Sequence, residues 1–148
     1  MQSQAVWIID NDLDDQDVLK DVWKELKLTN ELIFLKDAEE AMRMLEQVRI
    51  APFIIICELN LPGVNGFDLR QKMLDRNKKR FKSVPFIFWA TQASEQQIVK
   101  AYDLAVHGLF IKDPNFNELK NTFICIINYW LKSKMPSKED LESKSNFH

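Results

Sequence analysis

The stretch Glu58-Leu59-Asn60-Leu61-Pro62-Gly63-Val64-Asn65-Gly66 decides the fold, because it holds two of the three glycines in a chain of 148 residues. It directly follows the apolar run Phe53–Cys57, which Pro52 precedes. A buried strand that ends in a carboxylate and then turns on Pro-Gly is typical of an open α/β sheet, which presents reactive groups at its carboxyl edge. We therefore expect Glu58 to lie at such an edge.

Two other apolar runs also end in charged residues. Val6–Ile9 precedes Asp10-Asn11-Asp12, and Leu109–Ile111 precedes Lys112. Because the carboxyl ends of parallel strands meet at the same edge of a sheet, we expect these side chains to lie near Glu58. The sequence thus predicts a small charged crevice built from two acids and a lysine at three strand ends.

Apolar runs and segments of helical periodicity alternate along the whole chain. The predicted strands cover residues 5–9, 32–35, 53–57, 86–89 and 108–111. The predicted helices cover about 14–27, 37–48, 67–74, 94–106 and 115–132, and Ser94 with Gln97 matches a capping box. Five strands in strict alternation with five helices predict an α/β fold, a doubly wound parallel sheet with helices on both faces.

Length, charge and hydropathy narrow the class of protein further. A chain of 148 residues with a net charge of −2 is sufficient for one packed core and offers no electrostatic attraction to nucleic acid or an anionic membrane. The sequence shows no membrane-spanning apolar run and no signal peptide. We expect one domain over residues 1–132, a polar, flexible tail over 133–148 and a cytoplasmic location. Cys57 and Cys125 lie in apolar stretches and are expected to be buried free thiols.

Over about residues 5–132 the chain resembles the receiver domain of two-component response regulators. The resemblance rests on five βα units with IIDND after the first strand, ELNLPGVNG after the third and FIKDP after the fifth. It implies the flavodoxin-like strand order 2-1-3-4-5. In that family an aspartate after the third strand accepts a phosphoryl group from a histidine kinase, while two acids and a backbone carbonyl bind Mg²⁺. A Thr or Ser and a Lys then contact the phosphoryl oxygens.

The resemblance implies a metal site that this chain matches only in part. Asp10 stands at the position of the first metal-binding acid, whereas Asn11 replaces the second. Glu58 and the backbone carbonyl of Asn60 complete the set that the family would use. Because one carboxylate is missing, we expect Mg²⁺ binding to be weakened or absent.

The phosphoacceptor position also departs from the family pattern. Glu58 stands where the family has aspartate, and Ala90 falls at the hydroxyl position, which Thr91 fills only if the register slips. Lys112 matches the family lysine, and Phe110 takes the aromatic position on the fifth strand. A glutamate carboxylate lies one C–C bond, roughly 1.5 Å, further out, and a misplacement of about 1 Å costs on the order of a hundredfold in rate. We expect impaired phosphorylation, with Glu58 as an inert acid, as a weak imitation of the phosphorylated state, or as a residual acceptor.

The resemblance implies a protein that signals by contact and is not an enzyme. Its expected partner is a histidine kinase, a phosphorelay protein or another regulator, with a homodimer through the face Ile98–Trp130 as a further alternative. A different class is a small Mg²⁺-dependent phosphatase of the haloacid dehalogenase type, which would use Asp10 as nucleophile and Asp12 as general acid. That alternative requires a later pair of acids at a strand end, which the chain does not supply convincingly.

Overall fold

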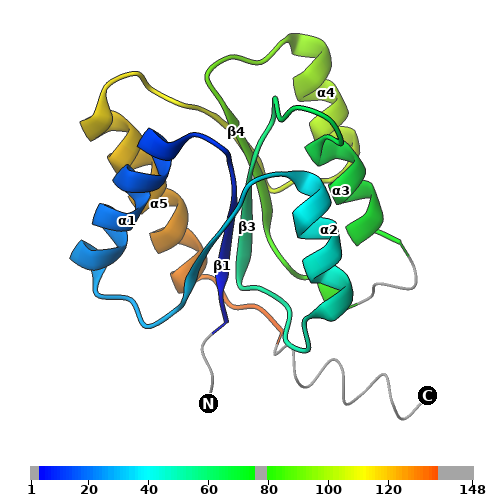
Figure 1. Ribbon diagram of the computed structural model, residues 1–148, viewed down its shortest axis with the longest axis horizontal. Helices are drawn as coiled ribbons and strands as arrows, with labels where there is room; N and C mark the ends of the chain where they lie inside the picture. The colour runs from blue at the N-terminus through cyan, green and yellow to red at the C-terminus, as the bar shows by residue number, and fades with distance from the viewer. Residues whose placement is uncertain (1–3, 76–79, 137–148) are drawn as a thin grey trace.

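The computed structural model describes residues 4–75 and 80–136 as a five-stranded parallel sheet with helices on both faces (Figure 1). The strand order β2-β1-β3-β4-β5 confirms the predicted topology. The strands are β1 (Val6–Ile9), β2 (Leu32–Leu35), β3 (Ile54–Glu58), β4 (Phe86–Ala90) and β5 (Gly108–Ile111).

The helices divide into two layers, as Figure 1 shows. One face of the sheet carries α1 and α5, and the other carries α2, α3 and α4. Their bounds are α1 (Leu13–Leu26), α2 (Ala38–Gln47), α3 (Gly66–Met73), α4 (Glu95–Asp103) and α5 (Phe116–Lys132). The arrangement follows from right-handed crossovers between parallel strands.

Alternation along the strands separates the core into two halves. In β4, Phe86, Phe88 and Ala90 pack in the half that also contains α2 and α3 residues. Ile87 and Trp89 pack in the half covered by α1 and α5. Since successive side chains of a strand point to opposite faces, the same rule decides which strand-end residues face α1.

Polar side chains fix the start of each helix near the carboxyl edge of the sheet. Asp12 caps α1, Asn65 caps α3 and Asn115 caps α5 by accepting hydrogen bonds from backbone N–H groups. The predicted capping box of Ser94 and Gln97 is confirmed at α4. These caps satisfy first-turn donors that have no partner within the helix.

Two strands extend further toward the charged edge than the sequence predicts. Glu58 is the last residue of β3 and pairs with Trp89, while Ala90 is the last residue of β4. At the other end, β3 begins at Ile54, one residue later than predicted. The N–H of Phe53 still donates a hydrogen bond to the carbonyl of Ala5 beside β1. Glu58 is therefore held by the sheet itself rather than by the following loop.

The prediction for the cysteines is half wrong. Both are free thiols, and Cys57 is buried, but Cys125 is exposed. The buried side of α5 carries Leu119, Phe123, Ile126 and Ile127. Cys125 lies off that face, because apolar content alone does not decide which side of a helix a residue occupies.

The predicted division into domain and tail stays a prediction. The last helix ends at Lys132, and Met135 still packs against the core half beside α1 and α5. Residues 137–148, which make up most of the predicted tail, lie outside the described residues. Within the described ranges, no helix has the length and apolarity required to cross a membrane.

A charged pocket at the carboxyl edge of the sheet

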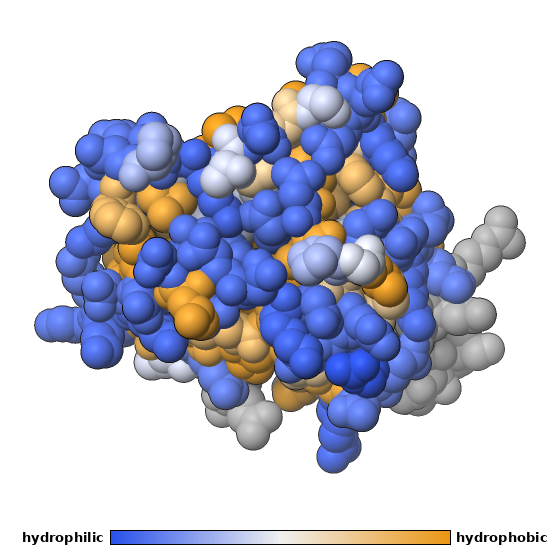
Figure 2. Space-filling model, turned by 45° about the horizontal axis from the view of Figure 1, so that its top comes forward, coloured by the Kyte–Doolittle hydropathy of each residue, from blue (hydrophilic) through white to orange (hydrophobic). Residues whose placement is uncertain are grey.

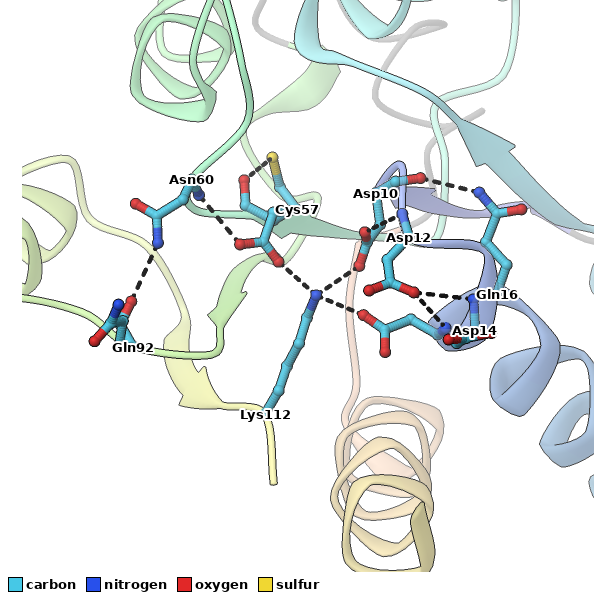
Figure 3. Close-up of polar contacts among 10 residues, drawn as sticks. Asp10, Asp12, Asp14, Gln16, Cys57, Asn60, Gln92 and Lys112 are labelled. Atoms are coloured by element: carbon cyan, nitrogen blue, oxygen red, sulfur yellow. Dashed lines mark hydrogen bonds and ion pairs between the residues drawn. The ribbon is translucent and has the colours of Figure 1, made fainter. Parts of the chain in front are cut away.

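The predicted crevice exists, and its centre is Lys112. The ammonium Nζ lies 2.9 Å from Oδ2 of Asp10, 2.6 Å from Oδ2 of Asp15 and 2.5 Å from Oε2 of Glu58. Figure 3 shows Lys112 reaching across the edge toward Asp10. We call Asp10, Asp15, Glu58 and Lys112 the charged pocket.

The strands place three of these side chains on the same face of the sheet. Asp10 follows Ile8 by two residues and Glu58 follows Ile56 by two, and both isoleucines pack in the core half of α1 and α5. The backbone N–H of Lys112 donates to the carbonyl of Ala90 at 2.7 Å, which extends the β4–β5 ladder by one residue. The pocket is therefore a direct consequence of strand alternation at the carboxyl edge.

Asp15 is the member of the charged pocket that the sequence analysis missed. Its buried partners on α1 are Leu19 and Val22, which follow it by four and seven residues and share its face of the helix. An acid on the apolar face of a predicted helix is the signal that identifies it.

The neighbouring polar residues hold the start of α1 in place, and Asp12 lines the same hollow as Lys112 and Asp15. Asn11 is exposed. Asp12 caps α1, and its Oδ1 accepts from the N–H groups of Asp14 and Asp15 at 2.9 and 3.1 Å. The N–H of Asp12 in turn donates to Oδ1 of Asp10 at 2.9 Å. The first turn of α1 is thus pinned to the end of β1.

Asn60 connects the pocket to the start of α4. Its N–H donates to Oε1 of Glu58 at 3.3 Å, and its Nδ2 donates to the carbonyl of Gln92 at 3.1 Å. Its Oδ1 accepts from Nε2 of Gln97 at 2.9 Å. The side chain of Asn60 therefore joins the β3–α3 loop to the β4–α4 loop. Its predicted carbonyl contact with a metal stays a prediction.

The remaining predicted positions fall on two sides of the sheet. Ala90 is fully buried in the core half of α2 and α3, away from Lys112. Thr91 lines the same hollow, of about 350 Å³, as Lys112, Asp15 and Pro114. Phe110 is partly buried against the core half beside α1 and α5. A hydroxyl therefore stands at the pocket one residue later than the resemblance implies.

Burial and charge act in opposite directions on the ionisable groups. Burial raises the pKa of Asp10 to about 6, even though the ammonium of Lys112 lowers it. Burial by itself lowers the pKa of Lys112, but Asp15, Glu58 and Asp10 outweigh it and raise that pKa above its usual range. Lys112 therefore remains a cation at neutral pH. The ring centroid of Trp89 lies 4.9 Å from its Nζ, which adds a cation–π contact.

The side chains of the pocket do not fit the Mg²⁺ ion that the resemblance implies. Mg²⁺ requires oxygen ligands at about 2.0–2.1 Å in near-octahedral geometry. Here the ammonium of Lys112 occupies the point at which the carboxylates of Asp10, Asp15 and Glu58 converge. Within residues 4–75 and 80–136, no group of three or more Asp, Glu, His or Cys side chains is arranged to hold a metal ion.

The fold and the charged strand ends define a receiver-type signalling domain. The family model described as "Response regulator receiver domain" matches residues 6–124, and the chain belongs to this family. Its function therefore lies in two-component signalling, whose receiver-domain proteins are typically not enzymes.

Known relatives agree with this family. The chain is 24% identical over 135 residues to the response regulator Rcp1 of Synechocystis sp., covering 88% of this chain and 90% of the relative. It is 26% identical over 113 residues to the probable methanogenesis regulatory protein FilR2 of Methanothrix harundinacea, covering 74% of this chain and 72% of the relative.

Solved structures show the same fold. The crystal structure of the phosphorylated cyanobacterial phytochrome response regulator RcpA superposes with a TM-score of 0.81 at 24% identity, covering 91% of this chain and 99% of that one. The crystal structure of the Mn²⁺-bound form of Rcp1 gives a TM-score of 0.79 at 24% identity, covering 90% of this chain and 99% of that one. Nothing in the fold or the comparisons supports the haloacid dehalogenase alternative, since Asp12 serves as a helix cap.

Proposed function

We propose that this receiver signals by protein contact and that its phosphoacceptor position is impaired. Its partner is a histidine kinase, a phosphorelay protein or another regulator in the cytoplasm, and the chain catalyses no reaction of its own. The observation that supports the proposal best is the ion pair between Oε2 of Glu58 and Nζ of Lys112, at 2.5 Å.

Both oxygens of Glu58 are already engaged in this pocket. Oε2 is paired with Lys112, and Oε1 accepts the N–H of Asn60 at 3.3 Å. A phosphoryl acceptor must approach the phosphorus in line, with a cation that neutralises the charge between the two anions. Glu58 presents neither a free oxygen nor a free cation, so a phosphoryl donor meets three carboxylates with one ammonium among them.

The usual coupling of a phosphoryl group to α4 is replaced by neutral hydrogen bonds. Asn60 already bridges Gln92 and Gln97 at the start of α4. Ala90 has no hydroxyl, and its side chain faces the opposite core half. These contacts favour one constant arrangement of α4 that is independent of a phosphoryl group.

The face Ile98–Trp130 is the proposed contact surface. Val99 and Tyr102 on α4, Ile111 on β5 and Tyr129 on α5 expose 52%, 56%, 51% and 65% of their surface. The surface turned forward in Figure 2 is mostly hydrophilic, with apolar residues in scattered patches. Exposed aromatic side chains are enriched at protein interfaces. A partner, or a second copy of the chain, is proposed to bind there.

Phosphoryl uptake from acetyl phosphate, followed by intact mass, tests the proposal. With Mg²⁺ present, wild type is expected to gain no phosphoryl mass. Uptake by Glu58→Asp, whose side chain is shorter by one bond, would show that the site is disabled chiefly at that residue. If neither protein is modified, Asn11 and Ala90 have disabled it as well. The matched control is Asp68→Glu, which lengthens an exposed carboxylate side chain on α3 by one bond. It is expected to stay unmodified. A stoichiometric adduct on wild type contradicts the impaired site.

A further inference from the structure

The charged pocket contains one acid fewer at position 11 and one acid more at position 15 than the resemblance implies. Asn11 is exposed, whereas the Asp15 side chain is only 12% exposed and reaches Lys112 at 2.6 Å. We infer that Lys112 is the resident cation of this receiver in place of a divalent metal, and that Asp15 is the positioning residue that holds it there. The inference deepens the proposed function and rests on it.

The lysine donates hydrogen bonds to Asp10 and Asp15 and forms an ion pair with Glu58. An ammonium has three N–H groups and no acceptor. Asp10, Asp15 and Glu58 each place one oxygen within 2.9 Å of Nζ. The lysine side chain is 7% exposed, and the face of Trp89 lies beneath it. The ammonium is therefore surrounded by three carboxylates and largely shielded from water, and this charge balance is what a buried cation requires.

Asp15 is presented to the pocket by the first turn of α1. Its N–H donates to Oδ1 of Asp12 at 3.1 Å, and Asp12 is itself joined to Asp10 through its own N–H. Gln16 adds a hydrogen bond from Nε2 to the carbonyl of Asp10 at 3.0 Å. Figure 3 shows this turn against the end of β1. The carboxylate of Asp15 is thus held in place before it meets Lys112.

A divalent ion must compete with Lys112 for the same oxygens. Mg²⁺ loses its hydration shell reluctantly, and its entry would separate the ammonium from carboxylates on β1, α1 and β3 at once. The displaced lysine would then be a buried, unpaired charge, which is strongly unfavourable. We therefore expect the pocket to exclude Mg²⁺ and Mn²⁺, and its conformation to be independent of either ion.

The first experiment titrates the wild-type protein with Mn²⁺, followed by electron paramagnetic resonance of the free ion, and measures Tm in Mg²⁺ and in EDTA. We expect no bound Mn²⁺ at millimolar concentration and a change in Tm of about 1 °C or less. Mn²⁺ bound at one site per chain, together with a Tm several degrees higher in Mg²⁺, would overturn the inference. This result is independent of any variant and of phosphoryl uptake, so the metal inference and the proposed function fail separately.

A second experiment removes the lysine and leaves the carboxylates. Lys112→Met frees Asp10, Asp15 and Glu58, so we expect this variant to gain Mn²⁺ binding and a Tm that depends on Mg²⁺. Adding Asp15→Asn to it should weaken the gained affinity about tenfold, because a ligand carboxylate is lost. Lys120→Met, at the exposed ion pair with Glu25, is the control and should behave as wild type. Equal Mn²⁺ binding by wild type and Lys112→Met would contradict the inference.

Discussion

Nζ of Lys112 lies 2.6 Å from Oδ2 of Asp15, although the two residues are 97 positions apart in the sequence. The contact joins the end of β5 to the first turn of α1 across the carboxyl edge of the sheet. Because both side chains are largely buried, removing one partner is more costly than at a surface ion pair, since it leaves an uncompensated buried charge. It links the stability of the fold to the state of the signalling pocket.

Removing the ammonium should destabilise the protein strongly. Lys112→Met leaves three largely buried carboxylates without their cation, at a cost of about 3–5 kcal/mol in the free energy of unfolding. Urea denaturation at neutral pH, in EDTA, measures this loss. Lys120→Met is the control, because its partner Glu25 is 55% exposed and such pairs contribute less than about 1 kcal/mol. Equal losses in the two variants would show that Lys112 has no special role.

The raised pKa of Asp10 predicts a specific dependence of stability on pH. The folded-state pKa is about 6 against 3.8 for the ordinary group, so the folded chain binds more protons within that interval. The contribution to stability is complete below about pH 4 and is lost as the pH rises toward 6, by roughly 2–3 kcal/mol.

Asp10→Asn is the variant that tests this dependence, because its side chain stays neutral at every pH. The difference in unfolding free energy between wild type and Asp10→Asn should fall across the interval from about pH 4 to 6. The matched control, Asp14→Asn, removes an exposed acid in the same turn, and a fall of equal size in it would assign the effect to the loss of any one charge rather than to Asp10. A flat difference for Asp10→Asn would refute the raised pKa.

The two cysteines should differ sharply in reactivity. Cys57 is buried, and burial raises its thiol pKa, so little thiolate forms there. Cys125 is exposed on α5. Treatment with N-ethylmaleimide at neutral pH should give one adduct by intact mass in native buffer and two in urea. Cys125→Ser should then remain unlabelled until the chain unfolds, and rapid native labelling of that variant would contradict the burial of Cys57.

A buried arginine should hold the turn between α4 and β5. Arg70 is 2% exposed, and its Nε and Nη2 donate to the carbonyls of Leu104 and Ala105, both at 2.9 Å. Arg70→Met leaves both carbonyls without these donors and should cost about 2–4 kcal/mol. Amide hydrogen exchange around Val106 should accelerate in the same variant.

The control for this prediction is a surface arginine in a helical ion pair. Nη1 of Arg43 lies 3.5 Å from Oε1 of Glu39, and the arginine side chain is 59% exposed. Arg43→Met should therefore change the free energy of unfolding by less than about 0.5 kcal/mol. If Arg70→Met shows a loss as small as that control, and exchange at Val106 is unchanged, the turn does not depend on Arg70.

Most of the fold follows from patterns that are local in the sequence. The apolar residues of β1, β3 and β4 are all buried, as expected for strands covered on both faces. The meeting of Asp10, Glu58 and Lys112 was also predictable, since parallel strands end at a common edge.

What the sequence did not reveal depends on the direction of single side chains. Asp15 stands among other acids at the start of α1, and only its spacing from Leu19 and Val22 marks it as inward-facing. The positions of Ala90 and Thr91 depend on one residue of strand alternation at the end of β4, where local pattern carries little information. Whether a lysine or a metal occupies a pocket depends on packing, which residue types alone do not specify.

The central claim is that Lys112 is a fixed cation among three carboxylates, and the side-chain ammonium can be observed directly. A ¹H–¹⁵N correlation of lysine ε-ammonium groups at neutral pH detects only those that exchange slowly with water. We predict one protected signal that is absent from Lys112→Met, present in Lys120→Met, and unchanged by millimolar Mg²⁺. The absence of any protected signal from wild type, or its loss when Mg²⁺ is added, would contradict the account.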